Sequence, residues 1–281
     1  MIKVLAITGG FSPLVPELKS CNKLSVVGVL NCFSSDKLES FANEHDIPYK
    51  ILEKQDILLA QWIEEKSPDV IVTFRLPFLL KKEIFSIPRY GSMNIHPSLL
   101  PKYRGPNPWF WIYYNMEAES GVTIHKLKEK EDNGDIVCQQ KFIIPIGSKL
   151  DDLRIKSTEI GIKLMLDVLY NIENVTPIPQ PISSPTVRAR NIESYQDLID
   201  WQNWPVSRIW HMLNGFPDIL ESNADYLSLN KKLKVQRYAR DVINIQTGSF
   251  IFVDGSYILK CCDGIIFFEE KDYYINTDAL S

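Results

Sequence analysis

Short apolar segments alternate with helix-like segments along the first hundred residues, and this alternation constrains the fold more than any other feature. Five segments have the apolar, β-forming composition of buried strands, and they cover residues 2–8, 25–30, 49–52, 70–74 and 94–96. Strands separated by helices of about ten residues are typical of βαβ units, in which helices cover both faces of a parallel sheet. The pattern therefore predicts an α/β protein with a mainly parallel sheet.

The fifth expected strand carries two polar side chains at its carboxyl end. Asn94 and His96 are two residues apart, so both side chains should point to the same face of the sheet. Pro97 has no amide hydrogen for further strand pairing, so the strand should end there and continue as a loop. Open α/β sheets bind their ligands at the carboxyl ends of strands, which makes this pair a candidate site.

Other kinds of site have little support in the sequence. Gly9-Gly10 does not extend to the dinucleotide pattern G-x-G-x-x-G, and no P-loop pattern G-x-x-x-x-G-K-[ST] occurs. No G-x-S-x-G pattern surrounds Ser98, which argues against a serine nucleophile. A zinc site on His96, His125 and Asp132 is conceivable from residue types alone, but no ligand spacing supports it, and the cysteines show no C-x-x-C pair. We therefore expect no metal.

Composition and charge narrow the class of protein further. The 281 residues carry a net charge of -4, and we interpret the basic cluster at 231–240 as a solvated face, so nucleic acid is not the expected partner. The first residues form too short an apolar run for a signal peptide, and no stretch approaches eighteen apolar residues. We therefore expect a cytoplasmic protein that does not bind a membrane.

The sequence pattern changes at two places in the second half of the chain. Two alternating segments, 120–127 and 136–146, predict strands around an acidic loop, and a long helix should begin near Ser148. A proline-rich stretch over 177–185 follows, and after it come short β-like runs such as 244–246. We therefore predict a first domain over 1–175, a linker over 176–204 and a small β-rich C-terminal module over 205–281.

Four motifs, taken in order, give the chain a resemblance to a known family. They are Asn94–Pro101, Tyr103–Gly105, Gly121–Ile124 and Asp132–Asp135. Together they resemble the catalytic core of the 10-formyltetrahydrofolate-dependent formyltransferases, which include the glycinamide ribonucleotide, methionyl-tRNA and sugar N-formyltransferases. The resemblance implies a Rossmann-like formyltransferase core, N-formyltransferase activity and 10-formyltetrahydrofolate as co-substrate, without a metal.

The same resemblance implies a catalytic trio of Asn94, His96 and Asp132. Formyl transfer to an amine passes through a tetrahedral intermediate, and an Asn94 amide hydrogen would stabilise the negative charge that develops on its oxygen. Histidine ordinarily titrates near neutrality, so His96 would accept or relay the proton that the attacking amine loses. Asp132 would orient His96 and help to move that proton.

The resemblance also places the pterin ring of the folate between two loops, one after the fourth expected strand and one before Asp132. The residues that it implies for folate binding are Arg75, Leu76, Pro77, Phe78, Leu99, Lys128, Glu129, Lys130 and Glu131. Arg104 and Trp109 are our candidates for contacts with the acceptor substrate. His125 lies on a neighbouring expected strand, and we interpret it as a structural or rim residue.

Three acceptor amines stay open at this point. Glycinamide ribonucleotide formyltransferases normally end soon after the long helix, and methionyl-tRNA formyltransferases carry a larger C-terminal barrel. The chain is most similar to the sugar N-formyltransferases, which implies formylation of a nucleotide-linked amino deoxysugar, with a dTDP-sugar as our leading expectation, for surface polysaccharide synthesis such as that of the lipopolysaccharide O-antigen. The alternatives are a methionyl-tRNA formyltransferase-like enzyme, a folate or sugar-nucleotide binding protein without catalysis, and hydrolysis of the folate to formate. A homodimer is the oligomeric state that we consider.

Overall fold

The structure of the 281-residue chain is a computed structural model, and it describes residues 1–225, 227, 232–240, 244–253 and 255–270. The chain divides into two compact units that interleave in sequence. Unit 1 consists of Met1–Ile112, Glu119–Ile143 and Arg154–Asn191, and unit 2 consists of Tyr113–Ala118, Ile144–Leu153 and Ile192–Ser281. The range predicted as a linker, 176–204, is thus divided between the units, with residues 176–191 in unit 1.

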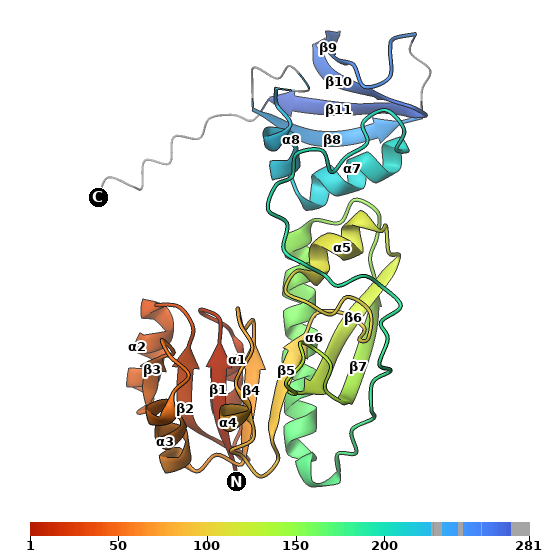
Figure 1. Ribbon diagram of the computed structural model, residues 1–281. Coiled ribbons are helices and arrows are strands. Elements are labelled where there is room, and N and C mark those ends of the chain that lie inside the picture. Colours follow the sequence, from red (N-terminus) through yellow and green to blue (C-terminus); the bar gives the residue numbers. More distant parts are fainter. Residues whose placement is uncertain (226, 228–231, 241–243, 254, 271–281) are drawn as a thin grey trace, which may run out of the picture. The chain divides into compact units, whose positions relative to one another are not determined.

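A seven-stranded sheet with the strand order β3-β2-β1-β4-β5-β6-β7 forms the centre of unit 1 (Figure 1). The strands are β1 (Ile2–Thr8), β2 (Leu24–Asn31), β3 (Tyr49–Ile51), β4 (Val70–Phe74), β5 (Ser92–His96), β6 (Glu119–Lys126) and β7 (Ile136–Ile143). β1 to β5 pair in parallel, whereas β6 pairs antiparallel with β5 and β7 pairs antiparallel with β6. The predicted α/β fold with a mainly parallel sheet is confirmed.

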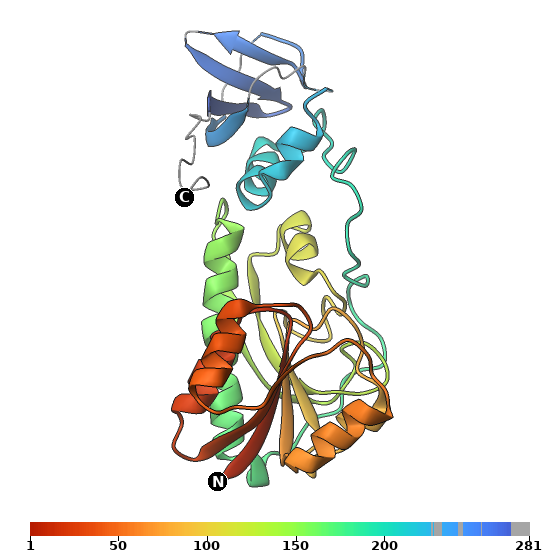
Figure 2. The ribbon, with the colours of Figure 1, turned by 90° about the vertical axis from the view of Figure 1, so that its left-hand side faces the viewer.

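Helices lie on both faces of this sheet, as Figure 2 shows. The helices over residues 1–174 are α1 (Leu14–Ser20), α2 (Asp36–Glu44), α3 (Ile57–Lys66), α4 (Lys82–Phe85), α5 (Pro108–Tyr114) and α6 (Leu150–Tyr170), with a short 3-10 turn at Ile172–Asn174. The Asp56 carboxylate accepts a hydrogen bond from the Leu59 amide at 3.0 Å and caps α3, as the sequence predicts. None of the helices in the described part of the chain is long and apolar enough to span a membrane.

The two faces of the sheet are packed differently. On one face, apolar side chains of β1, β2 and β4 form a buried cluster with α3. On the other face, α6 approaches β5 so closely that a Cβ atom at Gly161 would lie 2.5 Å from Ile95 Cγ2. Asn94 and His96 flank Ile95 along β5, so their side chains point away from α6. The close packing of α6 therefore helps to hold the strand that carries them.

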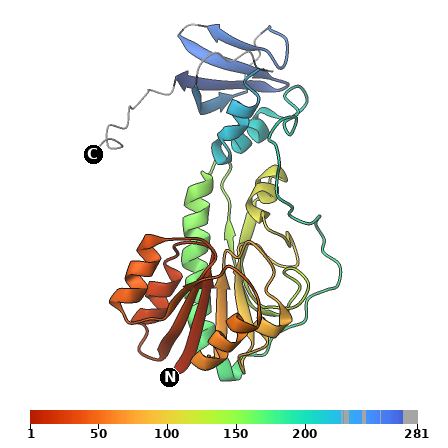
Figure 3. The same cartoon turned by 60° about the vertical axis from the view of Figure 1, so that its left-hand side comes forward.

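After α6, the chain continues along the outer edge of the unit 1 sheet (Figure 3). Ile178 forms a β-bridge with Ile136, the first residue of β7. Residues 179–191 contain no helix or strand. This segment is therefore part of unit 1 through its contacts, although its composition is that of a linker.

Unit 2 contains a four-stranded antiparallel sheet with the order β8-β11-β10-β9. Its elements are α7 (Val206–Gly215), α8 (Asp218–Ser222), β8 (Leu233–Ala239), β9 (Phe250–Val253), β10 (Ser256–Cys261) and β11 (Gly264–Glu270). The predicted β-rich character of the C-terminal module is confirmed. The strand expected at 244–246 is wrong, because the chain bends there instead of forming a strand. Much of the basic cluster at 231–240 lies on β8, an edge strand where exposed charged side chains are common, while Lys231 is outside the described residues.

Candidate active site

The carboxyl end of β5 brings Asn94 beside a histidine of the neighbouring strand. β5 and β6 pair with Asn94 opposite His125 and with His96 opposite Thr123. Residues directly opposite each other in an antiparallel pair project to the same face, so the side chains of Asn94 and His125 meet. The Asn94 Nδ2 atom lies 3.2 Å from His125 Nε2.

One further hydrogen bond fixes the Asn94 amide, and another fixes the His125 ring beside it. The Thr73 hydroxyl donates to Asn94 Oδ1 at 2.8 Å, and the His125 Nδ1–H group donates to the Lys126 carbonyl at 2.9 Å. The nitrogen of a carboxamide can only donate, so Asn94 Nδ2 is the donor in its contact with His125 Nε2. Nδ2 carries two hydrogens, and the second is available to a ligand.

His96 and Asp132 form the second half of the site. The His96 Nε2–H group donates to the Tyr103 carbonyl at 3.0 Å, which leaves His96 Nδ1 3.5 Å from Asp132 Oδ2. The other Asp132 oxygen, Oδ1, lies 3.5 Å from His125 Nε2. The Gly105 amide donates to Asp132 Oδ2 at 2.9 Å. One carboxylate therefore faces both imidazole rings.

Burial and charge set the protonation states of this cluster. His96 is 4% exposed and His125 is 1% exposed. Burial lowers the pKa of His96 by more than the Asp132 carboxylate raises it, so the ring is neutral near pH 7. Burial would raise the pKa of Asp132, but attraction to the positive charge that His96 takes up when it is protonated, the contact with His125 and the Gly105 amide hydrogen together hold that pKa well below its usual range. At neutral pH, an ionised carboxylate thus lies beside a His96 Nδ1 atom that can accept a proton.

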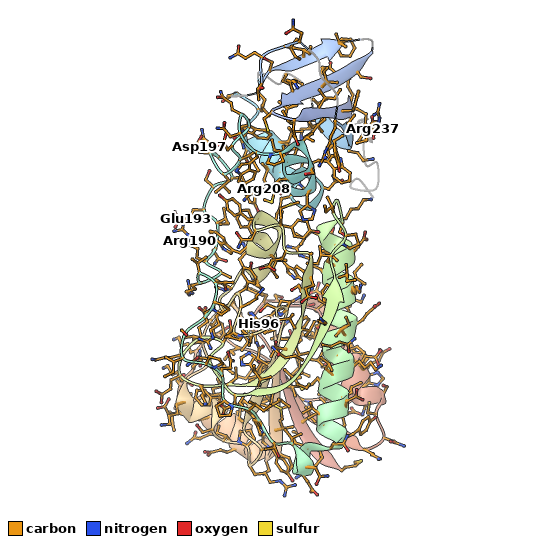
Figure 4. The ribbon with its side chains drawn as sticks, turned by 90° about the vertical axis from the view of Figure 1, so that its right-hand side faces the viewer. His96, Arg190, Glu193, Asp197, Arg208 and Arg237 are labelled. Atoms are coloured by element: carbon orange, nitrogen blue, oxygen red, sulfur yellow. The ribbon has the colours of Figure 1, made fainter. Side chains whose placement is uncertain are left out.

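A cavity of about 790 Å³ opens onto this cluster, and Asn94, His96 and Asp132 all line it. Eight residues indicated by the sequence for folate or acceptor binding line it too: Arg75, Leu76, Pro77, Phe78, Lys128, Lys130, Glu131 and Trp109. Figure 4 marks His96 within unit 1. A cavity of this size accommodates a small-molecule ligand. Across the described residues, no group of three or more His, Cys, Asp or Glu side chains is arranged to hold a metal ion.

Three of the residues expected to bind substrates, Leu99, Glu129 and Arg104, are not among the residues that line this cavity. Glu129 instead pairs with Lys82 at 3.3 Å, and both side chains are exposed. The Arg104 guanidinium donates to Gln180 Oε1 at 2.8 Å. The charged end of Arg104 is therefore engaged within the protein rather than directed into the cavity.

His125 and Thr73 belong to the cluster although no sequence pattern marks them. From sequence alone, His125 is interpreted as a structural or rim residue, because only the register of β6 against β5 places it beside Asn94. Thr73 lies on β4 opposite Asn94, and in the sequence it looks like any other residue of a buried strand. The one signal that points to them is their position on strands adjacent to β5, which becomes usable once the strand order is known.

The fold and the cluster define an α/β protein with an Asn–His–Asp site at the carboxyl end of a central strand, facing a ligand-sized cavity. The model of the Formyl transferase family matches residues 4–169. This chain belongs to the formyl transferase family, and the resemblance seen in its motifs is confirmed.

Comparison with known proteins gives two kinds of relative. The methionyl-tRNA formyltransferase of Ehrlichia ruminantium is 39% identical over 131 residues, which are 47% of this chain and 42% of that protein. That of Caldicellulosiruptor saccharolyticus is 31% identical over 211 residues, which are 74% of this chain and 67% of that protein. This chain therefore spans less than half the length of the first of these curated relatives.

The second kind of relative is a solved structure. The N-formyltransferase from Helicobacter canadensis, crystallised in complex with folinic acid and dTDP-3-aminofucose, is similar to 97% of this chain over 100% of its own, with a TM-score of 0.66 and 22% identity. At this level of identity, the likeness is one of fold.

Proposed function

We propose that this protein is a 10-formyltetrahydrofolate-dependent N-formyltransferase. The observation that carries the proposal is that Asn94, His96 and Asp132 all line one cavity, where Asn94 has a second amide hydrogen to donate and His96 Nδ1 lies 3.5 Å from the Asp132 carboxylate. Membership of the formyl transferase family supports it.

In the proposed reaction, the acceptor amine attacks the formyl carbon carried on N10 of the folate. The formyl oxygen becomes an oxyanion in the tetrahedral intermediate, and the second Nδ2 hydrogen of Asn94 donates to it. The amine loses a proton, which His96 Nδ1 accepts beside the ionised Asp132. The bond from carbon to N10 then breaks, N10 takes up a proton, and the products are the formylated amine and tetrahydrofolate.

The folate would occupy the part of the cavity between the loops 75–78 and 128–131. Residues of both loops line the cavity together with His96 and Asp132, so a pterin held there would present its formyl group to the cluster. The complex of the Helicobacter canadensis enzyme with folinic acid supports a folate as the ligand.

We propose a nucleotide-linked amino deoxysugar as the acceptor, with a dTDP-sugar as the leading candidate and surface polysaccharide synthesis as the process that it serves. The support is the similarity in fold to the Helicobacter canadensis enzyme. This similarity extends beyond residues 4–169, the range that the family model matches. Trp109 lines the cavity, and its ring offers an apolar surface to a sugar or a base.

Formylation of methionyl-tRNA is the second candidate. The 39% identity to the Ehrlichia ruminantium methionyl-tRNA formyltransferase favours it. The net charge of -4 argues against it, because contacts with RNA phosphates need clustered positive charge.

A formyl-transfer assay with three acceptors separates these candidates. The protein and 10-formyltetrahydrofolate are supplied in turn with dTDP-amino sugars, charged initiator tRNA and glycinamide ribonucleotide, and released tetrahydrofolate is followed. We expect transfer to a dTDP-amino sugar, reduced about 100-fold or more in His96→Ala. Gln140→Ala, at an exposed position of β7, is the matched control. Transfer to tRNA alone would reject the sugar, and full activity of His96→Ala would reject the proposed mechanism. Formate release without any amine would indicate hydrolysis.

A further inference from the structure

Residues 178–191, which we call the strap, form hydrogen bonds with two loops of the candidate site, the loop after His96 and the loop that carries Asp132. At one end, Ile178 and Ile136 exchange two backbone hydrogen bonds of 2.8 Å each. At the other end, the Ala189 amide donates to the Arg104 carbonyl at 2.7 Å. The strap is therefore anchored to unit 1 at both ends.

The strap holds the loop that follows His96. The Tyr103 amide donates to Thr186 Oγ1 at 2.7 Å, and the Ser184 hydroxyl donates to the Pro101 carbonyl at 2.7 Å. The Tyr103 carbonyl in turn accepts the hydrogen bond from His96 Nε2 at 3.0 Å. The strap thereby fixes the residue against which the His96 ring is oriented.

The strap also holds the loop that carries Asp132. The Arg188 guanidinium pairs with the Glu131 carboxylate through two contacts of 2.6 and 2.9 Å. Gln180 Nε2 donates to the carbonyls of Asp132 at 3.0 Å and Gly134 at 2.5 Å. Asp132 has a φ of 46°, in the left-handed region, which aspartate adopts more often than most residues but at some cost relative to the right-handed region.

Gln180 is the residue that joins the two loops. Its Oε1 accepts hydrogen bonds from the Arg104 guanidinium at 2.8 and 3.2 Å, while both Nε2 hydrogens go to the carbonyls of the Asp132 loop. A carboxamide has two donor hydrogens and two acceptor sites, so this side chain is fully hydrogen bonded. A rotated amide would set Nε2 against the guanidinium and Oε1 against the carbonyls, so only one orientation fits.

We propose that Gln180 is a positioning residue for formyl transfer, which sets the Asp132 carboxylate against His96 and His125. Its effect on the reaction rests on the proposed function, whereas its effect on Asp132 does not. Gln180 contacts the backbone of Asp132 and not the carboxylate, so it acts through the loop. Without its two donors, the carbonyls lose their partners and Asp132 can relax. A displacement of about 1 Å at a reacting group can lower the rate by about 100-fold.

Gln180→Glu separates the two halves of this contact. Glutamate keeps the size of the side chain and the acceptor oxygens for Arg104, but an ionised carboxylate cannot donate to the carbonyls of the Asp132 loop. We expect Gln180→Glu to lower kcat about 100-fold, and to change KM for folate and acceptor by less than about threefold. Gln180→Ala should have a similar effect, and Gln140→Ala should behave like the wild type.

A second measurement reports on the geometry of the site and does not require the protein to turn over substrate. The imidazole nitrogen NMR signals of His96 and His125 in the full chain report the position of the Asp132 carboxylate between them. We expect both signals to shift in Gln180→Glu and to stay in place in Gln140→Ala.

Three outcomes overturn the inference or separate it from the proposed function. Wild-type kcat together with wild-type imidazole signals in Gln180→Glu would overturn it. A raised KM with normal kcat would also overturn it, because Gln180 would then act in binding. If the wild type transfers formyl to no acceptor, the proposed function fails, while the imidazole signals still decide whether Gln180 positions Asp132.

Discussion

Removal of the Asn94 amide is the sharpest test of the proposed chemistry. One Nδ2 hydrogen is used by His125 at 3.2 Å, so a single hydrogen is left for the oxyanion. The loss of one such donor typically lowers kcat by about 100- to 1,000-fold, which corresponds to about 2.7–4 kcal/mol. KM in Asn94→Ala should change little, because the oxyanion exists only in the transition state and the intermediate.

Thr73→Val tests whether the orientation of this amide matters. The Thr73 side chain is fully buried, and its hydroxyl donates to Asn94 Oδ1 at 2.8 Å. Valine keeps the shape and removes the hydroxyl, so the amide loses one of its two restraints. The loss of a hydrogen bond worth about 1 kcal/mol predicts a fall in kcat of about five- to tenfold.

The two substitutions together form a double-mutant cycle. Thr73 acts on the reaction through Asn94, so Thr73→Val should lower kcat no further in an Asn94→Ala background. Single-turnover transfer at saturating folate and acceptor measures the chemical step, and thermal melts of each variant check that it folds. Additive losses would refute the proposed restraint. A loss of less than about tenfold in Asn94→Ala would refute the oxyanion role.

Two buried histidines predict how the activity and the stability of the protein depend on pH. Burial lowers the pKa of His96, and a protonated Nδ1 atom cannot accept the amine proton. We therefore expect kcat/KM to rise with pH, with a midpoint below the ordinary histidine pKa of 6.5. A midpoint above 6.5 would contradict the role of His96 as the proton acceptor. In unit 2, His211 is 2% exposed and accepts from the Gly147 amide at 2.9 Å, and burial lowers its pKa to about 4. The unfolded chain then binds a proton that the folded unit rejects, so stability should be full above pH ~6.5 and should fall by up to about 3 kcal/mol as the pH drops to ~4. Urea titrations should show that His211→Gln flattens this dependence, and an unchanged slope would contradict it.

The parallel part of the sheet is predictable from sequence because each strand there is a local signal. β1, β2 and β4 are continuous apolar runs, as expected for strands that are buried on both faces. β8 lacks this signal, since it is an edge strand whose charged side chains face outward. Pattern reasoning therefore succeeds where the apolar residues form a clear run, and it misses β8, where charged side chains interrupt that run.

The residues of the candidate site also differ in how far the sequence reveals their positions. Asn94 and His96 are found from a spacing of two on one strand, which is a local property. Asp132 is indicated only through the resemblance of the ordered motifs to the family, and the structure places its carboxylate 3.5 Å from His96 Nδ1. His125 depends on the register between β5 and β6, which no stretch of sequence reveals. Gln180 donates to a carbonyl 48 positions earlier in the chain, and nothing near it in sequence suggests that contact.

The composition that makes residues 177–185 look like a linker also suits them to hold a site. Proline has a restricted φ and no amide hydrogen, so a segment with four prolines loses little conformational entropy on ordering and leaves few backbone donors to satisfy. Gln180 lies between two of these prolines, and together with Thr186 and Arg188 it makes the contacts with the catalytic loops. A catalytic domain that ended at residue 175 would lack all three side chains, whereas unit 1 extends to Asn191. The site on β5 therefore depends on chain that lies well beyond the sheet that carries it.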